Sequence, residues 1–171
     1  MSYKLWKDRR DTFELLDLRG RIDNVLTELT EMAAETRKGQ GIHVIQSFRP
    51  IMYYGPILRD YCHVKTYYEN ETVFSSGDHN DEVCLVLKGN IRLVANRENN
   101  SGAAPLEMAT LGVGSFIGEN CLTRNVFRLS GVATEFTELL CIGKTRLNDL
   151  LERHPAVGVK LLRKFLESMS D

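Results

Sequence analysis

The stretch of sequence that decides the fold is GSFIGENCLTRNVFRLSGVAT, residues 114–134. It lies between segments that look like β-strands, but it is too glycine-rich for a stable strand and too short for an ordinary helix. An acid, Glu119, follows Gly118, and a base, Arg128, comes ten positions after that glycine. A glycine bend followed by residues 119–122 can form one helical turn, whose first backbone N–H groups have no partner within the turn.

Such a turn is suited to binding an anion, because its first N–H groups carry partial positive charge. Arg128 is far enough along the chain to return and offer a planar, bidentate donor to the same anion. The Glu119 carboxylate would accept a hydrogen bond from a sugar hydroxyl. One anion beside one hydroxyl describes a cyclic ribose phosphate. The alternative is a surface ion pair between Glu119 and Arg128, worth ~0–1 kcal/mol.

The region around this stretch has the two-residue periodicity of β-strands, with turn residues between the runs. Many short strands at close spacing favour a sandwich or barrel over a parallel α/β sheet. The predicted class is α+β, mainly β: an antiparallel, jelly-roll-like β-roll (double-stranded β-helix) flanked by N-terminal helices and two C-terminal helices. The expected strands are 62–67, 71–75, 82–88, 90–96, 105–111, 129–134 and 137–142.

The N-terminal part carries a heptad pattern over residues 11–35, with apolar residues at alternating spacings of three and four. This pattern fits two uses: a helix that associates with a second copy, or an amphipathic helix that packs on its own domain. We predict a division into residues 1–45, a helix and linker that could form a homodimer, and residues 46–171, the main domain.

Helices are also expected on either side of the strands. A short helix would start at 47–50 and break at Gly55-Pro56. Thr145 would cap a helix over 146–153, and Pro155 would open the last helix. The face of that last helix is expected to consist of Val159, Leu162, Leu166 and Met169.

Composition excludes several classes of function. There are 22 Lys+Arg and 23 Asp+Glu residues, so no overall field favours nucleic acid or anionic lipid. No signal peptide or membrane-span pattern is visible, which predicts a cytoplasmic protein. The four cysteines are interpreted as buried structural thiols, since none is in a C-x-x-C pair. The four histidines match no metal-site spacing, and no catalytic set is visible, so we expect neither a metal nor an enzyme.

The residues Gly118-Glu119-Asn120-Cys121-Leu122, with Arg128 ten after the glycine, resemble the phosphate-binding cassette of cyclic-nucleotide-binding domains. The similar versions are those of kinase regulatory subunits, catabolite activator proteins and cyclic-nucleotide-gated channels. The flanks agree, because 73–93 resembles the first hairpins of the family, and 112–116 resembles the approach to the cassette. The segment from 139 onward resembles its two closing helices, so the resemblance covers roughly 50–170.

This resemblance implies roles for individual residues. Glu119 would hold the ribose 2′-hydroxyl and Arg128 the cyclic phosphate, while the backbone N–H groups of Asn120 and Cys121 complete the cradle at Gly118. Leu162, Phe165 or Leu166 of the closing helix would cover the purine. The sequence departs from the family pattern at Ile117 and at Leu129, the residue before Ser130.

Leu129 has no hydroxyl for the exocyclic amine of guanine, which favours cAMP over cGMP as the ligand. The same side chain could instead fill the pocket. The expected function is therefore a non-catalytic regulatory module that binds a cyclic nucleotide and closes its C-terminal helix over it. The alternative is a ligand-free domain of the same fold that acts in dimerisation or protein interaction. Neither reading includes direct nucleic-acid or membrane binding.

Overall fold

The computed structural model of the chain describes residues 50, 53–95, 105–123 and 126–168, with only the backbone of Glu119 and Asn120. The predicted heptad helix and the 1–45 segment lie outside these residues. The strands are β1 (Cys62–Tyr67), β2 (Thr72–Phe74), β3 (Glu82–Lys88), β4 (Ile91–Ala95), β5 (Leu106–Leu111), β6 (Phe116–Ile117), β7 (Ser130–Ala133) and β8 (Thr137–Gly143). The helices are η1 (Glu119–Leu122, a 3-10 turn), α4 (Lys144–Arg153) and α5 (Pro155–Ser168), and residues 53–58 are also helical.

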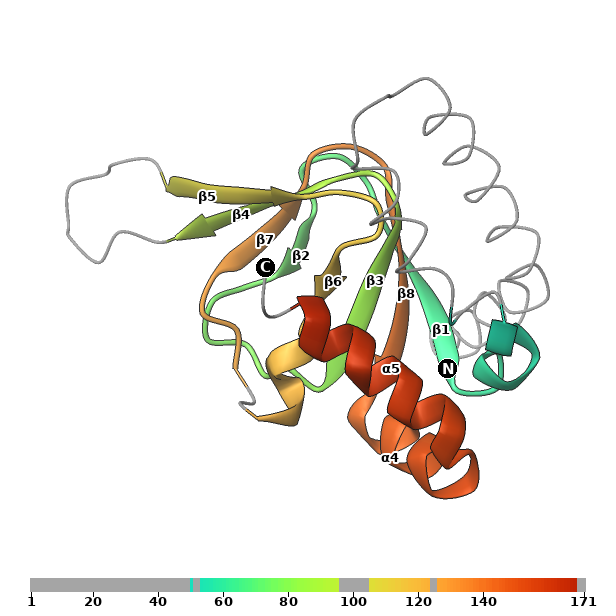
Figure 1. Cartoon of the computed structure of the whole chain (residues 1–171). Coiled ribbons are helices and arrows are strands. Elements are labelled where there is room, and N and C mark those ends of the chain that lie inside the picture. The colour runs from blue at the N-terminus through green and yellow to red at the C-terminus, as the bar shows by residue number, and fades with distance from the viewer. Residues whose placement is uncertain (1–49, 51–52, 96–104, 124–125, 169–171) are drawn as a thin grey trace, which may run out of the picture.

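The strands form two four-stranded antiparallel sheets that lie against each other (Figure 1). Sheet A has the order β1-β8-β3-β6, and sheet B has the order β2-β7-β4-β5. β8 is the central partner in sheet A, because it pairs along its length with both β1 and β3. This arrangement confirms the predicted β-roll with its C-terminal helices.

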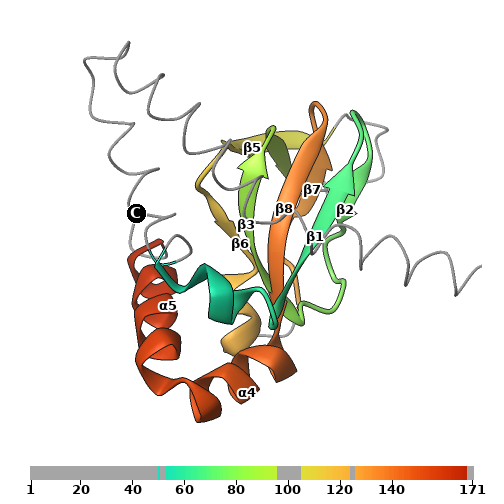
Figure 2. The same cartoon turned by 90° about the vertical axis from the view of Figure 1, so that its right-hand side faces the viewer.

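Two apolar cores lie on opposite faces of sheet A. Between the sheets, Phe74 and Ile91 of sheet B meet Val86 and Leu139 of sheet A. On the other face, the helices gather on one side of the sheets, as Figure 2 shows, and form the second core. That core includes Leu58, Val64, Leu85, Leu161 and Phe165. Alternate residues of β1 and β3 therefore contribute to different cores, which is the two-residue periodicity seen in the sequence.

The predicted strands are confirmed, each with ends within about two residues of its prediction, as expected for strand boundaries. β6 was not predicted, because a two-residue strand cannot show an alternating pattern. The predicted break at Gly55-Pro56 was wrong, since residues 53–58 form one helical segment. The Gly55 carbonyl accepts a hydrogen bond from the Arg59 N–H at 2.9 Å, which continues the helical pattern.

The capping residue of α4 was also predicted wrongly. Gly143, not Thr145, precedes the helix, and no side chain caps it. The junction is instead held by the Lys144 N–H, which donates to the Asp81 carbonyl at 2.8 Å. Because Asp81 immediately precedes β3, this bond ties the start of α4 to the neighbouring strand.

The predicted buried face of α5 was wrong as well. Val159 is 46% exposed and Leu166 is 64% exposed. The buried residues are Val157, Gly158, Leu161 and Phe165. A Cβ at Gly158 would lie 2.5 Å from Leu151 Cδ2, so this glycine lets α4 and α5 approach closely. A pattern counted from large apolar residues passes over that contact position.

Two of the cysteines are not the separate thiols that the sequence predicted. Cys84 and Cys141 form a disulfide between β3 and β8, with their Cα atoms 4.0 Å apart. Strand register places them directly opposite each other, although 57 positions separate them in sequence. Cys62 and Cys121 are buried, as predicted, and burial raises the pKa of the Cys62 thiol to about 12.

A polar cluster lies on sheet A beside this disulfide. His63 Nε2 lies 3.2 Å from Glu82 Oε1, and Lys65 Nζ pairs with the other carboxylate oxygen, Oε2. The hydrogen bond from His63 lowers the pKa of Glu82 to about 2, and Lys65 adds to this against the opposing effect of partial burial. The ionised carboxylate is therefore the form that the folded state stabilises.

The turn between β3 and β4 yields a test of packing. Gly89 has φ +81°, and a Cβ there would lie 2.4 Å from Thr137 Oγ1 and 2.5 Å from the Phe136 carbonyl. We expect Gly89→Ala to lower the free energy of unfolding by about 3 kcal/mol or more, from backbone strain plus the clash. Gly77→Ala is the matched control, because φ is +90° and nothing lies within 4 Å, and it should cost about 1–2 kcal/mol. Urea unfolding measures both, and equal losses would contradict the packing described for Gly89.

The depressed pKa of Glu82 makes stability depend on pH with a definite sign. Its contribution is present above the ordinary value of 4.5 and is lost as the pH falls towards about 2. Because the side chain is 30% exposed, we expect a contribution of about 1–2 kcal/mol. Urea unfolding at about pH 6 and about pH 3 should show a smaller acid-induced loss for Glu82→Gln than for the parent. The exposed Glu69→Gln variant should behave as the parent does, and the same behaviour from Glu82→Gln would exclude this contribution.

Candidate functional site

The segment singled out by the sequence begins with a glycine that no other residue could replace without strain. Gly118 is buried with φ +79°, and a Cβ there would lie 2.3 Å from the Glu82 carbonyl oxygen and 2.8 Å from Asn80 Oδ1. Its carbonyl accepts a hydrogen bond from Asn80 Nδ2 at 3.0 Å. The turn that follows β6 is thus pressed against the residues that lead into β3.

The expected single helical turn is present as η1. Within it, the Cys121 N–H donates to the Gly118 carbonyl at 2.8 Å, and the Cys121 side chain is fully buried. The Cys121 amide is therefore engaged by the turn itself. The roles predicted for the Glu119 and Asn120 side chains lie outside what the structure describes.

The returning segment that carries Arg128 is held by the loop between β2 and β3. The Phe127 carbonyl accepts from the Gly77 N–H at 2.8 Å, and the Phe127 N–H donates to the Asp78 carbonyl at 3.0 Å. The Ser76 hydroxyl donates to the Arg128 carbonyl at 3.0 Å. Backbone contacts thus fix the Arg128 main chain, while its side chain is exposed.

The two positions after Arg128 lead into β7. Leu129 is half-buried, so part of its side chain faces solvent. The Ser130 hydroxyl oxygen accepts a hydrogen bond from the Ser76 N–H at 3.0 Å. Ser130 therefore serves the same loop contact that holds Arg128, a role that sequence spacing did not indicate because Ser76 is 54 positions away.

A cavity of about 290 Å³ lies between the sheets, next to this segment. Ile117 and Phe127, which lie on either side of the cassette, both line it, and Phe127 stacks on Phe74 with ring centroids 4.2 Å apart. The remaining walls come mainly from β1, the loop after β2, and β3. Among the predicted site residues whose side chains the structure describes, none lines this cavity, so Arg128 faces a different, open region.

The η1 turn shares a core with the C-terminal helix. Cys121 belongs to the helix-side core together with Phe165, and Leu122 packs against that core. Phe165 is only 3% exposed, and its ring meets Phe116 edge-on at a centroid distance of 5.2 Å. Of the residues predicted to cover a purine, Phe165 is therefore already buried, whereas Leu166 is exposed.

Sequence reasoning missed the residues that support the site. Asn80 and Ser76 hold Gly118 and Arg128 through contacts between distant parts of the chain. It also missed the gathering of His63, Glu82 and Cys141, whose ligand atoms lie within 4.8 Å of one another. Their alternation along β-strands was visible, but only the register brings them together.

In the part of the chain that the structure describes, no helix has the length and apolar character needed to span a membrane. The family model of the cyclic nucleotide-binding domain matches residues 64–154. A 92-residue segment is 30% identical to the lysophospholipase nte1 of Neurospora crassa; it covers 53% of this chain but only 6% of that protein.

Solved structures show the same fold. A cyclic nucleotide-binding domain from Methylobacillus flagellatus superimposes with a TM-score of 0.61 at 23% identity, covering 71% of this chain and 65% of that one. The Thermus thermophilus catabolite activator protein gives a TM-score of 0.59 at 25% identity, covering 73% and 58%. The glycine-led turn, the β-roll around it and a family match over more than half of the sequence agree, and the chain belongs to the cyclic nucleotide-binding domain family.

Proposed function

We propose that this protein is a non-catalytic regulatory module that binds a cyclic nucleotide at the cassette from Gly118 to Ser130, and that it prefers cAMP to cGMP. The observation that carries the proposal is the left-handed, sterically closed turn at Gly118, followed by a one-turn helix. A chain returning to the same region through Arg128 is held by Ser76 and Gly77.

Each residue of the cassette has a chemical role in this proposal. The Arg128 guanidinium binds the cyclic phosphate through two parallel charge-assisted hydrogen bonds. The Glu119 carboxylate accepts a hydrogen bond from the ribose 2′-hydroxyl. Leu129 offers no hydroxyl to the exocyclic amine of guanine, which is the basis of the preference for cAMP.

The shared core of η1 and α5 supports a route from ligand to helix. Leu122 packs against the core that contains Leu161 and Phe165, so a shift of η1 on ligand binding changes the packing of α5. A ligand shifts such an equilibrium only by the difference between its affinities for the two arrangements. In this proposal, the C-terminal helix closes towards the ligand with Leu166, whose side chain is 64% exposed, facing it.

Binding at the cassette is tested with Arg128→Ala. We expect the variant to lose about 2–5 kcal/mol of cAMP affinity, because the buried phosphate loses its charged partner. Isothermal titration with cAMP and with cGMP measures the affinity and the preference together. Arg59→Ala, which removes an exposed arginine remote from the cassette, is the control and should bind as the parent does. An Arg128→Ala variant of parental affinity would refute the role given to Arg128.

We further propose that the protein is cytoplasmic and forms a homodimer through the heptad pattern of residues 11–35. Apolar residues at a and d positions bury most area when a second copy supplies the facing helix. Light scattering should give twice the chain mass for the whole protein and a single chain mass after deletion of residues 1–40. An unchanged mass after the deletion would remove the role of this segment in association.

A further inference from the structure

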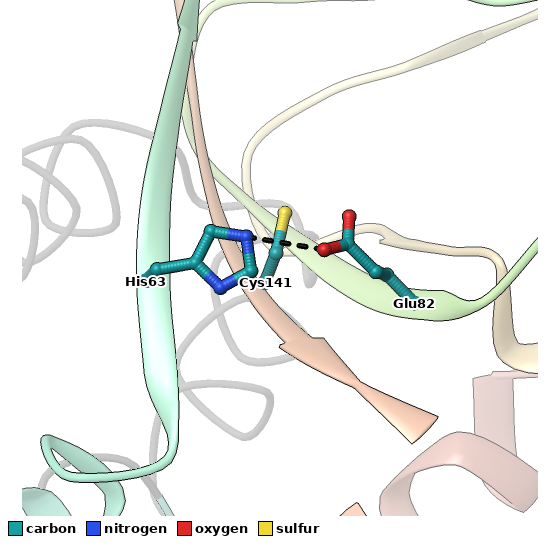
Figure 3. A group of neighbouring side chains, drawn as sticks. All are labelled: His63, Glu82 and Cys141. Atoms are coloured by element: carbon teal, nitrogen blue, oxygen red, sulfur yellow. Dashed lines mark ion pairs between the residues drawn. The ribbon is translucent and has the colours of Figure 1, made fainter. Parts of the chain in front are cut away.

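A second candidate site lies on sheet A, away from the cassette. The register of the strands places His63 of β1 and Cys84 of β3 on either side of Cys141 of β8. Glu82 lies two positions before Cys84 and so shares its face of β3. Figure 3 shows the His63 ring and the Glu82 carboxylate pointing towards each other, with Cys141 between their strands.

The distances among these groups match those around a single metal ion. His63 Nε2 and Glu82 Oε1 are 3.2 Å apart, and both lie within 4.8 Å of Cys141 Sγ. Two ligands of a tetrahedral Zn²⁺ with nitrogen and oxygen bonds of about 2.0–2.1 Å would be about 3.3 Å apart. Cys84 Sγ is bonded to Cys141 Sγ, so a fourth ligand atom is in the same place.

We propose that, once the Cys84–Cys141 disulfide is reduced, His63, Glu82, Cys84 and Cys141 bind one Zn²⁺. A dithiol reductant gives two electrons and two protons to the disulfide, which becomes two thiols while the reductant becomes a disulfide. Zn²⁺ then displaces both thiol protons and is held by two thiolate sulfurs, one imidazole nitrogen and one carboxylate oxygen. Thiolate with imidazole is a ligand set that favours zinc over magnesium or calcium.

Lys65 does not prevent this coordination, because the two carboxylate oxygens of Glu82 face different partners. Oε1 faces His63, and Oε2 pairs with Lys65. Lys65 can therefore keep Oε2 and fix the carboxylate while Oε1 binds the ion. Contacts of this kind, one step removed from the metal, orient the ligands in metal sites.

The ion also has a route from solvent. Glu82 and Cys84 line the cavity of about 290 Å³ between the sheets, together with Asp78 and Asp81. The two aspartates are exposed, and their negative charge favours entry of a cation. Cys141 is fully buried and Cys84 is 9% exposed, so the thiolates lie at the inner end of this route.

The proposal makes the disulfide and the metal alternative occupants of the same sulfur atoms. Disulfides are rare in reducing compartments, where the dithiol form is favoured. The same two strands are then cross-linked either covalently or through the ion. The redox state decides which cross-link is present.

Co²⁺ titration of the whole protein tests this proposal, because Co²⁺ replaces Zn²⁺ and reports tetrahedral thiolate coordination by its absorption. The protein is reduced and freed of reductant without oxygen. We expect one Co²⁺ per chain, visible d–d bands and a thiolate-to-metal charge-transfer band, all of which disappear when Zn²⁺ is added. The protein with its disulfide intact should show none of these bands.

Variants separate the site from adventitious binding. His63→Ala and Glu82→Gln change partly exposed side chains and should weaken Co²⁺ binding by at least about 100-fold. His79→Ala, which alters another histidine of the cavity wall, and Cys62→Ala, which removes a buried thiol, should bind as the parent does. The proposal is overturned if the reduced parent shows no charge-transfer band, or if His63→Ala and Glu82→Gln keep its intensity and affinity.

Discussion

The contact on which the candidate site depends is the packing of Gly118 against the start of β3. The Glu82 carbonyl and the Asn80 amide group occupy the space that a Cβ would need, and Asn80 donates to the Gly118 carbonyl. The positive φ of Gly118 then turns the chain from β6 into η1. Because this turn sets the direction of the cassette, the position of every later residue up to Arg128 depends on it.

Sheet A connects the different parts of the molecule. One face packs on the helices, and the other packs on sheet B, so each strand contributes alternate residues to two cores. Glu82 illustrates the consequence: its backbone carbonyl abuts the cassette glycine, while its side chain pairs with His63 and Lys65. A nucleotide site and a cysteine–histidine cluster thus share the same end of one strand.

The strands and the order of the elements were predictable, because alternating burial leaves a clear pattern in segments such as 82–88 and 137–143. The buried face of α5 was not, since the contact residue Gly158 carries no hydrophobic signal. Gly118 and Arg128 could be singled out by local spacing. Their supports, Asn80 and Ser76, could not, nor could the Cys84–Cys141 pair, because these contacts follow from strand register and loop packing over long sequence separations.

The account makes a spatial claim about the ligand that a structure of the protein crystallised with cAMP can decide. It predicts the cyclic phosphate within hydrogen-bonding distance of the Arg128 guanidinium and the ribose hydroxyl at the Glu119 carboxylate. Crystals grown at saturating cAMP in which no nucleotide is bound would contradict it. So would a nucleotide seated in the cavity beside Phe74 and Phe127, with Arg128 making no contact to it.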